Sequence, residues 1–273
     1  MAKPEAAPSK KRSGIVGISI LLVVTIIVNI ACMLFYSGIN TFMTANLNAK
    51  LSGNKSTSAA ILSTEEAAEN AKAMVKEIEA EGAVLLKNDD AALPLASGTH
   101  INLFGYATVD PIYGGSGSGA SDTSSNIDLV QGLKDAGFEV NQDLIDFYKK
   151  SGVSRVSQTG FSGSNFTPAE VEASAYTDDL LSSAREYADT AIVMFSRVGG
   201  EGGDLPTDMY AAKYSDTDDG RHYLELTQDE EDLLELVKSQ NYELVIVLVN
   251  SVSAMELGFL EDDSIDAALW VGG

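Results

Sequence analysis

The sequence predicts an α/β protein, a three-layer sandwich with a mostly parallel sheet, preceded by one transmembrane helix. Two near-continuous apolar runs, 243–249 and 265–271, are typical of strands that are buried on both faces of a sheet. Segments with strand character alternate with segments of helical periodicity, which implies parallel crossover connections. Residues 14–36 contain no charged side chain and, at about 1.5 Å per residue, form a helix long enough to cross a bilayer core of about 30 Å.

The amino-terminal region predicts a membrane anchor. Lys10, Lys11 and Arg12 precede the apolar stretch, so the positive-inside rule assigns residues 1–13 to a cytoplasmic basic tail and the chain after the helix to the outside. A cleaved signal peptide is the alternative, but the run exceeds the usual signal core of about 7–15 residues, which favours an uncleaved anchor. Residues 37–63, rich in Ser, Thr, Asn, Ala and Lys, are predicted to form a stalk. The predicted location is therefore the cell membrane, single-pass, with the carboxyl-terminal part extracellular.

Composition excludes several classes of function. The formal net charge is -22 and the pI about 4.2, and such a surface repels phosphate backbones, so no nucleic-acid partner is expected. Cys32 is the only cysteine, which excludes an internal disulfide and a cysteine-based zinc site. The acidic run Asp216–Gly220 resembles a calcium loop, but its glycine falls at the fifth position and no glutamate stands at the twelfth. No metal is therefore expected.

The first half of the soluble part predicts alternating helices and strands. Thr64 is placed to cap a helix that runs to about Leu86, and a turn over 87–95 follows. Four leucines of this region are expected in the core: Leu85, Leu86, Leu93 and Leu95. Further elements are a strand at 100–104, a helix at 127–136 closed by Gly137, a short strand at 138–140 and a helix at 144–150.

The second half continues the alternation. Residues 151–168 form a long Ser- and Gly-rich excursion, which favours a functional or partner-facing loop. A helical region from Pro168 to Tyr187 and a buried strand at 190–195 are expected to follow. Thr227 and Glu230 form a capping-box pattern that starts a helix ending near Gln240.

A glycine-rich loop directly follows the strand at 190–195. It reads Arg197-Val-Gly-Gly-Glu201-Gly-Gly-Asp204 and offers a carboxylate at the edge where α/β sheets bind ligands. Glycines let the backbone turn sharply and let a substrate approach closely. The alternative is a solvated acidic loop that only returns the chain.

A second glycine-rich stretch, Tyr113 to Gly119, follows the strand at 100–104. With Ala120 it formally satisfies the dinucleotide pattern GxGxxA, but about ten residues separate it from the strand and no helix opens at its end, so that interpretation is rejected. Both a ligand-lining loop and a plain flexible loop remain open.

Four blocks together resemble glycoside hydrolase family 3. Glu81-Gly-Ala-Val-Leu-Leu-Lys-Asn88, ending in Leu93-Pro94-Leu95, resembles the block that opens the α/β sandwich domain of that family. The other three are similar to its glycine-serine loop, its Gly-Glu-Gly-x-Asp loop and the strand before its closing segment; they are residues 113–119, 197–204 and 265–273. The blocks follow the family order over residues 64–273, and their combination is specific although each alone is weak.

The resemblance implies a retaining β-glycosidase of the β-glucosidase type, which hydrolyses O-glycosyl bonds without a cofactor. In that family a (β/α)8 barrel supplies an aspartate nucleophile, and many members take the acid/base glutamate from the sandwich, a role that falls on Glu201 here. The substrate-binding candidates are Arg197, Asp204, Gly115 and Ser116. Arg197 and Asp204 have the alternative role of bracing the loop, and Asp204 or Glu225 could replace Glu201 as proton donor.

The sequence departs from the family pattern in two ways. No barrel is present, and the sandwich follows the anchor directly, which resembles the reversed domain order with the barrel downstream. We therefore expect a domain that is incomplete after Gly273 and inactive by itself. Many members have arginine after the loop aspartate, where this chain has Leu205, so the sugar contacts of that arginine are not transferred. The alternative function is an anchored, non-catalytic carbohydrate-binding or structural surface domain.

Overall fold

The computed structural model describes residues 16–33, 36, 63–115, 123–124, 126–155, 166–201, 204–214 and 220–273. The chain divides into two units, residues 1–67 and 68–273. Within the first unit, Val16–Met33 forms a helix with a mean hydropathy of 2.7 and no buried residue. Its length and composition suit a membrane span, which is also true of a signal sequence at this position. The predicted tail 1–13 and all of the stalk except Ser63 lie outside the described residues.

The second unit is built on a six-stranded sheet of order β1-β6-β5-β4-β2-β3. The central strands β2 (His100–Phe104), β4 (Thr190–Arg197), β5 (Leu244–Ser251) and β6 (Ala267–Trp270) run parallel, as does the short strand β3 (Glu139–Val140). Strand β1 (Val84–Asn88) pairs antiparallel with β6 at one edge. The sheet is therefore mostly parallel, as predicted.

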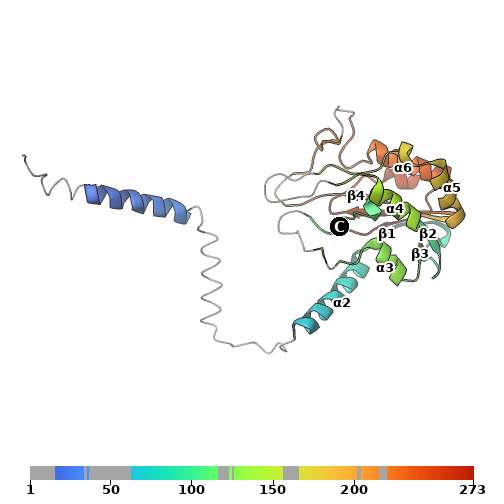
Figure 1. Ribbon diagram of the computed structural model, residues 1–273, viewed down its shortest axis with the longest axis horizontal. Coiled ribbons are helices and arrows are strands. Elements are labelled where there is room, and N and C mark those ends of the chain that lie inside the picture. Colours follow the sequence, from blue (N-terminus) through green and yellow to red (C-terminus); the bar gives the residue numbers. More distant parts are fainter. Residues whose placement is uncertain are drawn as a thin grey trace, which may run out of the picture. The chain divides into compact units, whose positions relative to one another are not determined.

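Helices cover both faces of this sheet (Figure 1). Helices α4 (Gln142–Lys150), α5 (Asp178–Tyr187) and α6 (Gln228–Ser239) lie on one side, and α3 (Leu129–Asp135) lies on the other. Helix α2 (Thr64–Gly82) precedes β1, and short 3-10 turns occupy 89–91, 106–108, 173–175 and 258–261. The predicted α/β architecture is confirmed.

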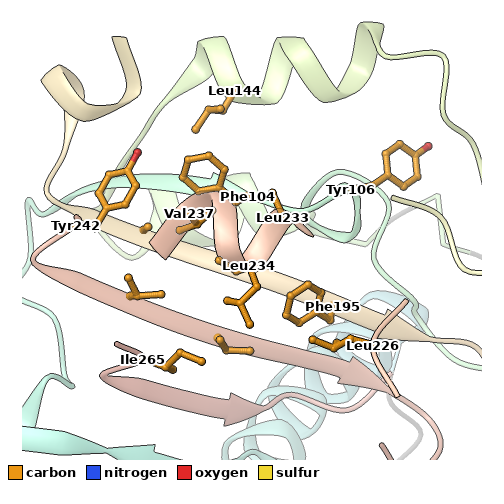
Figure 2. Packing of buried hydrophobic residues seen from close by; sticks show 14 of the residues in the cluster. Phe104, Tyr106, Leu144, Phe195, Leu226, Leu233, Leu234, Val237, Tyr242 and Ile265 are labelled. Atoms are coloured by element: carbon orange, nitrogen blue, oxygen red, sulfur yellow. The ribbon is translucent and has the colours of Figure 1, made fainter. Parts of the chain in front are cut away.

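Alternating strand residues divide the core into two clusters. On strand β4, Val193 and Phe195 face the larger cluster and Ile192 faces the smaller one. The larger cluster lies under α4, α5 and α6, and Figure 2 shows Phe104, Leu144, Leu233, Leu234 and Val237 among its labelled side chains. Strands that are apolar on both sides are what a sheet between two helical layers requires. This rigid platform fixes the positions of the loops that leave the strand ends.

The prediction that Thr64 caps helix α2 is wrong by one residue: the hydroxyl of Ser63 accepts from the N–H of Glu66 at 3.1 Å, and Thr64 is the first helical residue. The start of α6 is as predicted. The side chain of Thr227 accepts a hydrogen bond from the backbone N–H of Glu230, and Glu230 bonds back to the N–H of Thr227, which confirms the predicted capping box. Gly137 has φ of +90° after helix α3, as predicted for a residue that closes a helix.

The prediction for residues 83–88 is wrong in two respects. Helix α2 ends at Gly82 and Val84–Asn88 form strand β1, because they pair with β6 from the far end of the chain. Leu85 and Leu86 are exposed, at 54% and 37%, because β1 is an edge strand without a covering layer among the described residues. Leu93 and Leu95 do pack against the smaller core cluster, as expected.

Candidate functional site

The candidate site lies where the parallel strands end. The carboxyl ends of β2, β4, β5 and β6 meet at one edge of the sheet, so four connecting segments begin there. They start at residues 105, 198, 252 and 271. Ligands of open α/β sheets bind outside this edge. The segments after β2 and β4 carry the two glycine-rich loops that the sequence singles out.

Asn250 at the end of β5 joins two of these segments. Its Oδ1 accepts a hydrogen bond from the backbone N–H of Ile112 at 2.6 Å, and its Nδ2 donates to the carbonyls of Ile112 at 3.0 Å and Gly272 at 2.7 Å. The side chain is buried, so these bonds are protected from water. Asn250 therefore fixes the segments after β2 and β6 against the end of β5.

The two glycine-rich loops approach each other at backbone distance. A Cβ built on Gly115 would lie 2.9 Å from the carbonyl oxygen of Gly199 and 3.0 Å from the Cα of Gly200. A Cβ on Gly199 would lie 2.6 Å from a methyl group of Val252. Because real Cβ contacts are longer than this, glycine at these positions permits the close packing. The loop that carries Glu201 is thus held between the segments after β2 and β5.

Glu201 and Asp204 follow strand β4 and are both exposed to solvent. Glu201 begins a turn shortly after the end of β4, and both side chains are exposed. An exposed carboxylate at this place is accessible to a ligand. Gly202, Gly203 and Ser116 lie outside the described residues. Within the described part of the chain, no group of three or more His, Cys, Asp and Glu side chains is arranged to hold a metal ion.

Arg197 has a different environment from Glu201. Its side chain is fully buried at the end of β4, and its Nη1 and Nη2 lie 2.7 Å and 2.6 Å from the two carboxylate oxygens of Glu230. The remaining N–H groups donate to the carbonyls of Tyr223, Ser196 and Glu225. Burial alone would lower the pKa of Arg197, but the charge and hydrogen bonds of Glu230 raise it above its ordinary value.

These contacts occupy all five N–H donors of the Arg197 guanidinium. No N–H donor of Arg197 remains for a ligand. Of the two roles considered for this residue, the geometry favours bracing of the loop over contact with substrate.

The segment after the Glu201 loop, residues 204–214 and 220–226, is held by its own contacts. A third core cluster lies under it and consists of Ile112, Phe166, Val198, Met209, Ala212 and Tyr223. The hydroxyl of Tyr223 donates to the carbonyl of Val198 at 3.1 Å, and that of Tyr214 bonds to the carboxylate of Asp229 at the start of α6. The Glu201 loop therefore begins at Val198, a residue that is packed in this third cluster.

Arg155 also contributes to this edge, although it is not among the site residues predicted from the sequence. Its guanidinium donates to the carbonyl of Asp110 and to the hydroxyl of Ser196, both at 2.7 Å, and lies 3.7 Å from the Asp110 carboxylate. It links the segment after β2 to the end of β4. Burial lowers the pKa of Arg155, and the nearby Asp110 acts in the opposite direction. Arg155 is the only charged residue of the 151–168 excursion, which is the signal that points to it.

Glu170 is a second residue that the pattern did not reveal. Its carboxyl group is buried and accepts hydrogen bonds from the backbone N–H groups of Tyr106 at 3.0 Å and Val171 at 2.8 Å. Burial raises the pKa of Glu170 to about 8, and the negative charge of Glu230 acts in the same direction. Glu170 attaches the far end of the 151–168 excursion to the turn after β2.

Comparison with known proteins identifies the family of this domain. The model of the glycosyl hydrolase family 3 C-terminal domain matches residues 83–273. The chain therefore belongs to glycosyl hydrolase family 3 and carries its C-terminal domain. The match begins at β1 and includes every strand of the sheet.

The matched relatives are β-glucosidases. Beta-glucosidase A of Butyrivibrio fibrisolvens is 32% identical over 210 residues, which are 71% of this chain and 24% of that protein. The beta-glucosidase of Ruminococcus albus is 30% identical over 200 residues, 72% of this chain and 20% of that protein. The chain thus spans about a quarter of the length of these relatives or less.

Solved structures show the same likeness. Beta-glucosidase 3B of Thermotoga neapolitana, in complex with glucose, matches 76% of this chain and 27% of its own with a TM-score of 0.57 at 27% identity. A beta-glucosidase of Paenibacillus barengoltzii matches 72% of this chain and 20% of its own with the same TM-score at 26% identity.

Proposed function

We propose that this chain is part of a membrane-anchored, outward-facing retaining β-glycosidase of the β-glucosidase type, which hydrolyses O-glycosyl bonds in carbohydrate metabolism. The observation that carries the proposal is the position of Glu201. This exposed carboxylate stands on a glycine-rich loop at the carboxyl edge of a family 3 sandwich. The β-glucosidases of Butyrivibrio and Ruminococcus support a glycoside as substrate.

Glu201 is the proposed acid/base residue. A retaining glycosidase uses two carboxyl groups about 5–5.5 Å apart, one as nucleophile and one to protonate the leaving oxygen and then activate water. In this proposal a (β/α)8 barrel, the missing partner of this domain, supplies the nucleophile. The residues present here would then provide half of the pair, so the fragment alone has no turnover.

The remaining residues of the edge have supporting roles in the proposal. Asp204, Gly115 and Ser116 are the proposed substrate-binding residues. Arg197 acts through the backbone, because its buried guanidinium holds the segment around Tyr223 and Glu225 against the end of β4. Asn250 and Arg155 hold the segment after β2 in place beside the Glu201 loop.

The helix Val16–Met33 is the proposed anchor. Its 18 residues have a mean hydropathy of 2.7, and three basic residues precede it in the sequence. By the positive-inside rule the glycosidase domain then lies outside the cell. Alkaline carbonate extraction tests this point, because an anchored protein stays in the membrane pellet whereas a protein with a cleaved leader is released.

The leaving-group dependence of a Glu201→Gln variant tests the catalytic part. In the full-length enzyme, kcat/KM for an alkyl β-glucoside should fall by about 10²–10⁴, because its leaving oxygen needs a proton. A dinitrophenyl β-glucoside leaves without protonation, so its kcat/KM should change little.

Asp204→Asn and Glu225→Gln are the matched controls, since both remove a nearby carboxylate. Neither should show the difference between the two leaving groups. If one of them shows it and Glu201→Gln does not, the proton donor is that residue. If full-length protein binds β-glucosides and hydrolyses none, the alternative of a non-catalytic carbohydrate-binding domain holds.

A further inference from the structure

The helix Val16–Met33 carries Thr25, Asn29 and Cys32 on one face. Ile18, Leu22, Thr25, Asn29 and Cys32 recur at steps of four, three, four and three residues. Residues with this spacing share one face of a helix and form the seam through which two helices pack. The opposite face carries only apolar side chains, namely Ile20, Val24, Ile27 and Ala31.

Asn29 is the most polar group on this seam. Its Nδ2 donates one hydrogen bond to the carbonyl of Thr25 at 2.8 Å, while the hydroxyl of Thr25 bonds to the carbonyl of Leu21 at 2.9 Å. The hydroxyl is thus satisfied within its own helix. The second N–H of Asn29 and its Oδ1 have no hydrogen-bond partner among the residues that the structure describes.

An unsatisfied carboxamide is costly in hydrocarbon, because no water is present to replace the missing partners. A carboxamide is both a donor and an acceptor. The same residue on a second copy of the helix, related by a two-fold axis, supplies the acceptor for the free N–H and the donor for Oδ1. The group is therefore complementary to itself.

We propose that the helix Val16–Met33 is a self-association site through which two copies of this chain pair in the membrane, with Asn29 opposite Asn29 and the Ile18, Leu22, Thr25 and Cys32 side chains along the contact. This inference rests on the proposed membrane anchor. Polar residues at such seams hold transmembrane helices together by hydrogen bonds across the contact. Two glycosidase domains would then be carried by each membrane complex.

The position of Cys32 makes the proposal testable in the intact protein. Cys32 is the only cysteine of the chain and lies on the seam, one turn from Asn29. Membranes that contain the full-length protein are treated with copper phenanthroline and oxygen. The oxidant takes two electrons and two protons from two thiols, so a disulfide forms where the thiols of two copies meet. We expect a dimer band on non-reducing gels that disappears on reduction.

Exchange of two adjacent residues is the matched control. The double variant Ala31→Cys, Cys32→Ala keeps the composition and the depth of the thiol but turns it about 100° around the helix, away from the seam. It should give little cross-linked dimer. Equal cross-linking from both positions would mean random collision and would overturn the proposal.

The role of Asn29 is tested in the parent Cys32 background. Asn29→Leu should lower the cross-linked fraction about fivefold to tenfold, and Asn29→Gln, which keeps a carboxamide, should restore most of it. Ser19→Leu removes a hydroxyl beside the seam and should leave the fraction unchanged. Unaltered cross-linking in Asn29→Leu would overturn the pairing through Asn29.

The two proposals fail in different ways. If carbonate releases the protein from membranes, the anchor is wrong and the seam has no hydrocarbon environment. If every variant remains in the membrane pellet and the parent protein gives no cross-linked dimer, the anchor stands and self-association is wrong.

Discussion

Arg197 and Glu230 form a buried two-point ion pair that connects the end of strand β4 to the first turn of helix α6. The Nη1–Oε1 and Nη2–Oε2 distances are 2.7 and 2.6 Å, and the side chains are 0% and 4% exposed. Glu230 is also the N3 residue of the capping box of α6, and its carboxylate bonds back to the N–H of the N-cap residue Thr227. One carboxylate therefore serves both the helix start and Arg197. The Glu201 loop begins directly after Arg197.

Removal of one partner of this pair should destabilise the protein strongly. Arg197→Met or Glu230→Met leaves an uncompensated buried charge, and each should lower the free energy of unfolding by about 3–5 kcal/mol. The double variant should lose less than the sum of the two, as denaturant unfolding curves will show.

An exposed pair provides the control for that series. Lys150→Met breaks the ion pair of Lys150 with Asp146 on the surface of α4 and should cost less than about 1 kcal/mol. An Arg197→Met protein of normal stability but with a raised KM for β-glucosides would contradict the bracing role and return Arg197 to the subsite.

Gly115→Ala should lower activity more than stability. The new Cβ would lie 2.9 Å from the carbonyl of Gly199, so the Glu201 loop must shift. We expect kcat/KM for β-glucosides to fall by about 10- to 100-fold, as a displaced catalytic group gives, while the unfolding midpoint changes little.

Gly132→Ala is the matched glycine control. Gly132 lies in helix α3, where a Cβ would meet only a side-chain methyl at 3.9 Å. Alanine should stabilise the protein by about 0.5–1 kcal/mol and leave kcat/KM unchanged. Equal activity of the Gly115→Ala and parent enzymes would show that the contact between the loops is not needed for catalysis.

Glu170 should make stability fall as the pH rises. Its pKa of about 8 in the folded protein lies above the ordinary value of 4.5, so the folded state binds a proton that the unfolded state has lost between these values. The stabilising contribution is fully present below about pH 4.5 and is lost as the pH rises through about 8.

The Glu170→Gln side chain cannot titrate. From pH 5 to pH 9, the free energy of unfolding of this variant should therefore rise relative to that of the parent by about 2–4 kcal/mol. Urea midpoints of both proteins at the two pH values measure this difference. Glu172→Gln, which alters an exposed neighbour, should follow the pH dependence of the parent. Parallel curves for the parent and Glu170→Gln would show that Glu170 is ionised in the folded protein at both pH values.

The local sequence pattern was sufficient to predict most helices and strands of the fold. The β-branched runs became strands β4 and β5, and the Thr227–Glu230 spacing became the start of α6, because these features depend on neighbouring residues. Leu85 and Leu86 were placed in a helix because the helical periodicity before them continues. Their strand conformation depends on pairing with β6 more than 180 residues later, which local sequence does not contain.

The same distinction applies to the site. Glu201 stands out because glycines surround it in the sequence. Arg155 and Glu170 bond to groups 41 to 64 residues away, and the partner of Arg197 lies 33 residues away. Such contacts exist only after the sheet brings its strand ends together, so the bonding partners of these residues cannot be predicted from the local sequence.

The most direct test of the account is chemical rescue of a Glu201→Ala variant of the full-length enzyme by azide. With a dinitrophenyl β-glucoside the glycosyl-enzyme still forms, but its hydrolysis is slow because no base activates water. Azide needs no base, so it should raise kcat and give β-glucosyl azide, identified by NMR. A product of α configuration would make Glu201 the nucleophile, and absence of any rescue would contradict its role as the acid/base residue.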